Sequence, residues 1–118
     1  MAKILIVDDE AEWREAYRDC LTDAGYTVVT FENGHEALKH IQAHGCDLAV
    51  LDVRMSPGGQ EVLRSIRDIR PDLPVVVASS YAGYRDDPDF RGAAAFLDKS
   101  PRVSELLHAV RAVLARDA

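Results

Sequence analysis

The stretch KILIVDDE, residues 3–10, decides which fold the sequence predicts. After its first lysine it is apolar through Val7, and no polar residue alternates with the apolar ones. An unbroken apolar run of this length predicts a β-strand covered on both faces, which is typical of parallel sheets flanked by helices. The run ends at Asp8, Asp9 and Glu10, so acidic side chains follow the carboxyl end of the predicted strand.

The rest of the chain repeats this pattern of a short apolar run followed by an amphipathic stretch. Helices are expected where apolar residues recur every three or four positions, and Gly25 and Gly45 end the first two. Residues 80–92 predict only a short or broken helix, because Gly83 and Pro88 are poor residues for a helix interior. The expected strands are residues 3–7, 27–31, 48–51, 75–78 and 94–97, and the expected helices are residues 10–24, 33–44 with Asn33 as N-cap, a stretch through 62–69, and a last helix with Ser100 as N-cap and Pro101 in its first position.

This alternation predicts one α/β domain over residues 1–118, with a five-stranded parallel sheet and helices on both of its faces. Residues 27–31 mix polar and apolar side chains, so this strand is expected at an edge of the sheet and half exposed. An edge position for the second strand favours the order 2-1-3-4-5, which is common in doubly wound sheets.

The composition limits the partners that the chain can bind. Of 118 residues, 20 are acidic and 14 are basic, which gives a net charge of −6. Direct binding to nucleic acid is not expected, because it requires a basic face. A cation or a basic partner surface suits this charge better. The apolar run from Ile4 to Val7 is far too short for a signal peptide or a membrane span, so a cytoplasmic protein is expected.

Polar side chains follow the carboxyl ends of the first, third, fourth and fifth predicted strands, where open α/β sheets bind ligands. These strands are neighbours in the order 2-1-3-4-5, so their side chains are expected around one crevice. The side chains are those of Asp8 and Asp9 after the first strand, Asp52 after the third, Ser79 after the fourth and Lys99 after the fifth.

Carboxylates gathered in one crevice repel one another unless a cation neutralises them. Mg²⁺ prefers oxygen ligands and keeps positions for water and for substrate phosphate oxygens. Phosphoryl transfer requires positioning and charge neutralisation, which Mg²⁺ and the ammonium group of Lys99 can supply together. One carboxylate can act as the nucleophile, and the hydroxyl of Ser79 can donate a hydrogen bond to a phosphoryl oxygen. The pattern therefore predicts a Mg²⁺-dependent phosphoryl site.

The chain resembles the receiver domains of two-component response regulators over its whole length. The resemblance rests on the motifs ILIVDDE (residues 4–10), LDVRM (51–55), LPVVVASS (73–80) and FLDK (96–99). It implies the flavodoxin-like (βα)5 fold and Mg²⁺ as the cofactor. It also implies that Asp52 is the phosphoacceptor, that Lys99 is the phosphate partner, that Asp8, Asp9, Asp52 and the backbone carbonyl of Arg54 hold the metal, and that Ser79 and Phe96 form the switch.

The resemblance implies a role in phosphorelay signal transduction. A sensor histidine kinase or a histidine phosphotransfer protein would donate the phosphoryl group, and its transfer to Asp52 would switch the output face of the domain. The chain would not be an enzyme in the usual sense, because its catalysis is confined to Mg²⁺-dependent self-phosphorylation and autodephosphorylation. An output domain, a downstream target protein or a second copy of the chain would respond to the switch.

Departures from the family pattern support an alternative, a receiver-like interaction module that is not phosphorylated. The intact set of acids and lysine argues against this alternative. The departures are Ser100 between Lys99 and Pro101, a loop after Asp52 that has Ser56 and is one residue short, and a segment between Ser79 and Phe96 that is about two residues short.

A further alternative, an enzyme or a flavin carrier on the same fold, has little support. The sequence has no P-loop and no GxGxxG motif. Arg54 stands two residues after Asp52, where a phosphohydrolase with a DxD motif needs a second aspartate. The acids after the first strand would repel a flavin phosphate.

Overall fold

The computed structural model describes residues 2–53, 58–79, 88–90, 92–99 and 102–116. Within these residues strands and helices alternate as predicted. The strands are β1 (Lys3–Val7), β2 (Thr27–Phe31), β3 (Leu48–Asp52), β4 (Val75–Ser79) and β5 (Ala95–Asp98). The helices are α1 (Ala11–Asp23), α2 (Gly34–His44), α3 (Gly59–Ile69), the single 3₁₀ turn η2 (Pro88–Phe90) and α4 (Ser104–Arg116).

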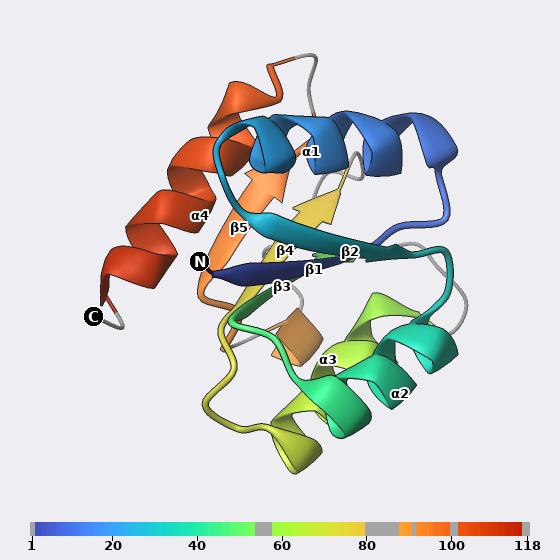
Figure 1. The fold of residues 1–118 in the computed structure, drawn as a ribbon. Helices are drawn as coiled ribbons and strands as arrows, with labels where there is room; N and C mark the ends of the chain where they lie inside the picture. Colours follow the sequence, from blue (N-terminus) through green and yellow to red (C-terminus); the bar gives the residue numbers. More distant parts are fainter. Residues whose placement is uncertain (1, 54–57, 80–87, 91, 100–101, 117–118) are drawn as a thin grey trace.

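The strands form one parallel sheet in the order β2-β1-β3-β4-β5, so the predicted α/β fold and strand order are confirmed. Figure 1 shows α1 and α4 on one face of the sheet and α2 and α3 on the other. Because every strand runs in the same direction, the residues that follow the strands meet at one end of the sheet.

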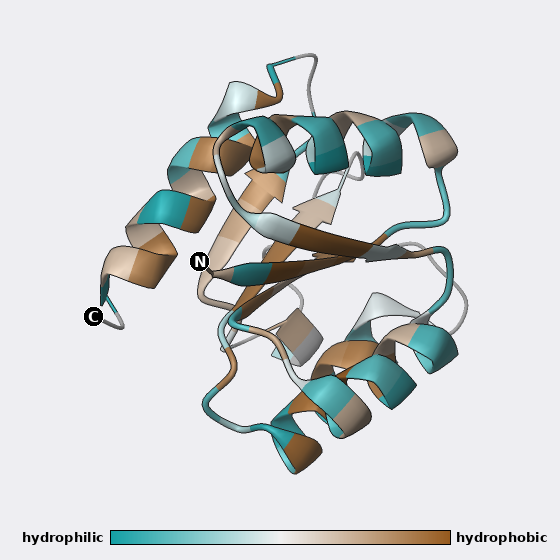
Figure 2. Cartoon of the chain, in the orientation of Figure 1, coloured by the Kyte–Doolittle hydropathy of each residue, from teal (hydrophilic) through white to brown (hydrophobic). Residues whose placement is uncertain are grey.

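β1 is buried on both faces, as its unbroken apolar sequence predicts. Leu5 and Val7 belong to a core shared with α2 and α3, whereas Ile4 and Ile6 belong to a second core shared with α1 and α4. These side chains are fully buried, which explains why no polar residue interrupts them. Figure 2 shows the same layering, with brown central strands and largely teal outer faces on the helices.

β2 lies at an edge of the sheet and is less buried, as predicted: Thr27 is exposed and the rest of the strand is half-buried. The N-cap of the next helix is also confirmed. The side chain of Asn33 accepts a hydrogen bond from the backbone N–H of Glu36 at 3.0 Å, and α2 begins at the next residue, Gly34. A side-chain cap of this kind stabilises a helix by about 1 kcal/mol.

Several boundaries differ from the predicted ones by one residue, and the start of the last helix differs by more. The prediction that this helix begins at residue 101 is wrong, because α4 begins at Ser104. The N–H groups of Glu105 and Leu106 bond to carbonyl groups three residues back, so a tight turn precedes the helix. Ser100 and Pro101 themselves lie outside the described residues.

Residues 80–92 are described only in part. The described part holds the single turn η2, and Phe90 in it is buried in the core beside α3. The prediction of a short or broken helix falls mostly on residues that the structure does not describe. Residues 80–87 and 91 lie outside the described residues, as does the loop 54–57. Among the helices that the structure describes, none is long and apolar enough to span a membrane.

Candidate functional site

The carboxyl ends of β1, β3, β4 and β5 bring buried polar side chains together. Asp8 follows β1, Asp52 ends β3, Ser79 ends β4 and Lys99 follows β5. Asp8, Asp52 and Ser79 are each at most 3% exposed, and the side chain of Lys99 is 0% exposed. Since buried charges are costly unless they are paired, the groups must compensate one another or hold an ion.

Carboxylate oxygens of four acids, Asp8, Asp9, Glu10 and Asp52, lie within 4.8 Å of one another. Asp8 and Asp52 are buried, whereas Asp9 and Glu10 are exposed at the open side of the cluster. An all-oxygen set with two buried carboxylates and an open side fits Mg²⁺, which prefers oxygen ligands and keeps several waters. Mutual repulsion of these carboxylates gives a cation a further reason to bind here.

Lys99 places its ammonium group inside this acid cluster. Its Nζ lies 2.9 Å from Asp8 Oδ2, 2.9 Å from Glu10 Oε1 and 3.4 Å from Asp52 Oδ1. Burial by itself would lower the pKa of Lys99, but hydrogen bonds to Asp8 and Glu10, together with the charges of Asp8 and Asp52, outweigh it and raise that pKa. The lysine is therefore charged and offsets part of the negative charge of the cluster.

The position of Asp8 is fixed by its backbone and its carboxylate. The Asp8 N–H donates to the carbonyl oxygen of Phe31 at 3.1 Å, and its own carbonyl accepts from Arg14 Nη1 at 2.8 Å. Asp8 Oδ1 accepts from the backbone N–H of Glu10 at 2.9 Å, which leaves Oδ2 facing Lys99. The end of β1 and the first turn of α1 thus hold this carboxylate rigidly.

The remaining predicted site residues lie at different depths. Ser79 is buried, and its carbonyl oxygen accepts from the Lys99 N–H at 2.8 Å, which ties the end of β4 to the lysine. Phe96 is half-buried on β5 opposite Val77 and packs against the core that faces α2 and α3. The predicted metal ligand at the backbone carbonyl of Arg54 lies outside the described residues.

Sequence reasoning assigned no role to three residues that the structure places at the site. Glu10 bonds to Lys99, Arg14 bonds to Asp8, and the ring of Trp13 has its centroid 5.8 Å from Lys99 Nζ. All three lie at or in the first turn of α1. Their spacing after the acidic pair was the available signal, because the first turn of a helix that follows a strand borders the carboxyl end of the sheet.

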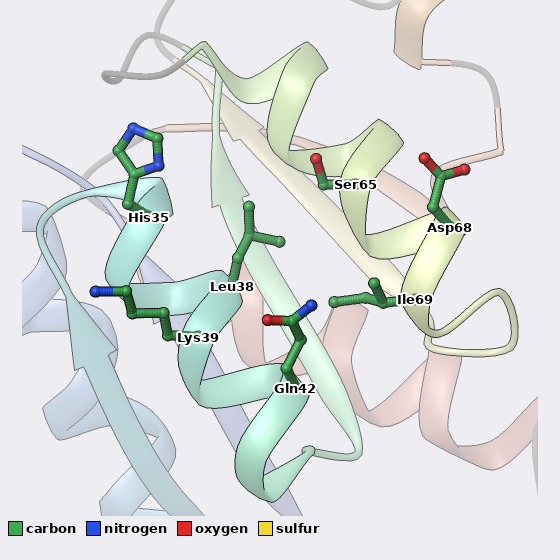
Figure 3. Close-up of a pocket in the computed structure, with 7 residues that line it drawn as sticks. All are labelled: His35, Leu38, Lys39, Gln42, Ser65, Asp68 and Ile69. Carbon is green, nitrogen blue, oxygen red and sulfur yellow. The ribbon is translucent and has the colours of Figure 1, made fainter.

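A separate pocket of about 360 Å³ lies between α2 and α3, away from the acid cluster (Figure 3). Apolar, polar and oppositely charged side chains line it together, and no residue of the acid cluster is among them. The lining residues are His35, Leu38, Lys39, Gln42, Ser65, Asp68 and Ile69.

Known proteins are similar to this chain in sequence and in fold. A family model described as the response regulator receiver domain matches residues 4–111. The response regulator MprA of Mycobacterium ulcerans (strain Agy99) is 39% identical over 121 residues, covering 97% of this chain and 50% of MprA. This chain spans about half the length of the curated relatives that it matches.

Solved structures match over nearly the whole chain. The response regulator protein TrrA from Thermotoga maritima, in complex with Mg²⁺-BeF, has a TM-score of 0.91 and 36% identity, covering 96% of this chain and 99% of TrrA. A structure of the histidine kinase ThkA in complex with TrrA gives a TM-score of 0.89 and 36% identity, covering 97% of this chain and 99% of the matched one.

Proposed function

The chain belongs to the response regulator receiver domain family, and on this premise we propose that it accepts a phosphoryl group on Asp52 in a Mg²⁺-dependent reaction. Members of this family act in phosphorelay signalling. The observation that carries the proposal is the meeting of Asp52, Asp8 and Lys99 at the carboxyl ends of three strands. Burial of several charged groups is costly, and a cluster of them at the ligand-binding end of the sheet is typical of a functional site.

Asp52 is the nucleophile in this proposal. An oxygen of its carboxylate attacks the phosphorus atom, an O–P bond forms, and the bond from phosphorus to the donor's leaving group breaks. The ammonium of Lys99, 3.4 Å from Asp52 Oδ1, is near enough to bind a phosphoryl oxygen that the carboxylate has acquired. Phosphoryl transfer needs little more from a protein than such positioning and neutralisation.

Mg²⁺ would be held by the carboxylates of Asp8, Asp9 and Asp52, with the backbone carbonyl of Arg54 as a further ligand. When bound, the ion neutralises the carboxylates and the transferring phosphoryl oxygens. The all-oxygen cluster supports this assignment, and so does the Mg²⁺-BeF complex of the similar protein TrrA. In the same proposal Lys99 is the phosphate partner and Ser79 donates its hydroxyl to the phosphoryl group.

The phosphoryl donor is proposed to be a sensor histidine kinase or a histidine phosphotransfer protein. The complex of ThkA with TrrA supports a kinase as partner. Self-phosphorylation from a small phosphodonor and slow autodephosphorylation are the only catalysis proposed. The whole chain, residues 1–118, would form one receiver domain in the cytoplasm.

Phosphorylation would change the charge and contacts at the ends of β4 and β5. A phosphoryl group adds close to two negative charges at neutral pH and three strong hydrogen-bond acceptors. Ser79 would turn its hydroxyl toward them, and the half-buried Phe96 would change rotamer on the next strand. A target protein, an output domain or a second copy of the chain would recognise the altered face.

Labelling with acetyl phosphate and Mg²⁺, followed by intact-mass measurement, tests the proposal. We expect one phosphoryl adduct on the wild-type protein, loss of it in Asp52→Asn, and retention of it in Asp19→Asn, which removes an exposed carboxylate of α1. EDTA present during labelling should prevent the adduct. An adduct on Asp52→Asn at the wild-type rate would refute the assignment, whereas no adduct on the wild-type protein would favour the unphosphorylated interaction module.

A further inference from the structure

Glu10 occupies the N-cap position of α1 but does not cap the helix. Its side chain makes no hydrogen bond to the backbone N–H groups of the first turn. Residues at this position are usually Ser, Thr, Asp or Asn, because their short side chains reach those N–H groups. The longer side chain of Glu10 instead accepts a hydrogen bond from Lys99 Nζ at 2.9 Å. Helix capping therefore does not account for this residue.

Asp8, Glu10 and Lys99 form a closed ring of hydrogen bonds. The backbone N–H of Glu10 donates to Asp8 Oδ1, and Lys99 Nζ donates to both Asp8 Oδ2 and Glu10 Oε1, with every distance at 2.9 Å. Asp52 Oδ1 is farther from the ammonium, at 3.4 Å. The lysine is thus held on the α1 side of the cluster rather than by the phosphoacceptor.

The ammonium group of Lys99 and the proposed Mg²⁺ would both bind the carboxylate of Asp8. Its Oδ2 faces Lys99, and its carboxylate is also a proposed ligand for Mg²⁺. A divalent ion held there would repel the ammonium, and Lys99 would then need a partner other than Asp8. The Lys99 side chain is 0% exposed, so an ammonium without an anionic partner would be costly. The Glu10 side chain is 50% exposed and can follow the lysine.

We propose that Glu10 is a positioning residue for Lys99, which holds the ammonium group beside the site when a divalent cation takes Asp8. By giving the displaced lysine a partner, Glu10 lowers the free energy that cation binding costs. It also keeps Lys99 within reach of the phosphoryl group that arrives at Asp52. This inference rests on the proposed function, since it assumes that the cluster binds Mg²⁺.

Glu10→Asp tests the contact without changing the charge. Aspartate is one methylene shorter and is a favoured N-cap residue, so the variant should fold while its carboxylate turns to the helix. The matched control is Glu12→Asp, the same change at another acidic residue of the first turn of α1. The same pair of variants is also made in a Lys99→Met background, where no ammonium remains to be held.

Mg²⁺ affinity is measured by calorimetry, and the fluorescence of Trp13 gives a second readout. Trp13 is the one tryptophan of the chain and lies 5.8 Å from Lys99 Nζ, so its emission responds to where the ammonium goes. In the wild-type background we expect Glu10→Asp to weaken Mg²⁺ binding by about two- to fivefold, the range typical of a partly exposed ion pair. Emission of the Mg²⁺-saturated protein should change with it.

The expected pattern is specific to a residue that acts through Lys99. Glu12→Asp should bind Mg²⁺ as the wild type does, and Glu10→Asp should have no effect in the Lys99→Met background. Unchanged affinity and emission in Glu10→Asp would overturn the inference. So would an equal loss in the Lys99→Met background, which would make Glu10 a direct metal ligand.

Failure of the proposed function would look different. The wild-type protein would then show neither Mg²⁺ binding nor a phosphoryl adduct, and this inference would fall with it. If the wild type binds Mg²⁺ and is labelled while Glu10→Asp matches it, only the role of Glu10 is refuted. Should Lys99→Met not fold, the same pair of variants is made in a Lys99→Gln background, which also carries no ammonium group.

Discussion

Substitution of Gly59 by alanine should disturb the backbone that carries Asp52, because the new methyl group would contact it. Gly59 begins α3, and its N–H donates to the carbonyl oxygen of Val53 at 3.0 Å. A Cβ atom at this position would lie 2.7 Å from the carbonyl oxygen of Asp52 and 2.9 Å from the Cα of Val53. Both neighbours are backbone atoms of the segment that carries Asp52, the proposed phosphoacceptor, so they cannot move aside as the end of a side chain can.

The overlap sets the size of the effect. Ordinary contacts begin at 3.4 Å, so the new methyl group is about 0.7 Å too close to the Asp52 carbonyl. Overpacking of this kind costs about 1–3 kcal/mol, and replacing glycine in a helix returns up to about 1 kcal/mol. We expect Gly59→Ala to lower the free energy of unfolding by about 1–2 kcal/mol, and Tm by about 3–10 °C for a domain of this size.

Thermal unfolding followed by circular dichroism measures the loss, and Gly58→Ala is the control. A Cβ at Gly58 would be close only to Gln60 Oε1, at 2.9 Å, and that flexible side chain can turn away. Gly58 has a φ of −56°, which any residue adopts. Gly58 is the N-cap of α3, where alanine is less favourable than glycine, so the control should lose some stability but less than Gly59→Ala. Only Gly59→Ala should also label more slowly with acetyl phosphate. Equal Tm values for the two variants would refute the reasoning.

Two further predictions concern charge. Lys99→Met leaves buried carboxylates without their cation, so the metal-free protein should lose about 3 kcal/mol of stability. Added Mg²⁺ should recover most of it, and a Tm deficit that Mg²⁺ does not reduce would contradict this. Burial, Lys3 and His44 lower the pKa of His40, whose Nε2 lies 2.7 Å from Lys3 Nζ. A lowered folded-state pKa means that the unfolded chain binds the proton more readily, so stability should fall as pH drops below about 6.5. Thermal unfolding between pH 7.5 and 5.5 should show a steeper loss for the wild type than for His40→Gln, and parallel curves would count against it.

The fold could be predicted well because the order of polar and apolar residues in a strand depends on which of its faces are buried. β1 and β2 illustrate this. The unbroken apolar sequence of β1 reflects a strand covered on both faces, and the two threonines among the apolar residues of Thr27–Phe31 reflect a strand at the exposed edge. These patterns indicate which strand is central and which is at the edge, and an edge position for the second strand favours the observed order without fixing it. The last helix begins at Ser104, later than predicted, because a proline in the sequence does not by itself fix the residue at which a helix begins.

The strand topology predicts which residues meet at the candidate site, but it does not predict which side chains pair with one another. Parallel strands must bring Asp8, Asp52 and Lys99 to the same end of the sheet, whatever their side chains do. Side-chain rotamers and the turn into α1 decide which acid pairs with Lys99. Neither produces a repeating pattern in the sequence, so the pairing could not be predicted. Asp8 is buried and Asp9 is exposed, although they are adjacent and chemically identical.

Glu10 is a residue whose role is indicated by distances in the structure and not by its position in the sequence. Its position after the acidic pair is visible in the sequence, and by helix statistics it is simply a poor N-cap. Only the distances show that the unused cap is compensated by Lys99, because Glu10 Oε1 lies as near to Nζ as Asp8 Oδ2 does. A local rule broken without a local benefit is the kind of signal that a functional site leaves in a sequence. The same test applies to Lys99, since full burial of its ammonium group is costly even with carboxylate partners, and the proposed phosphoryl site at Asp52 accounts for its position.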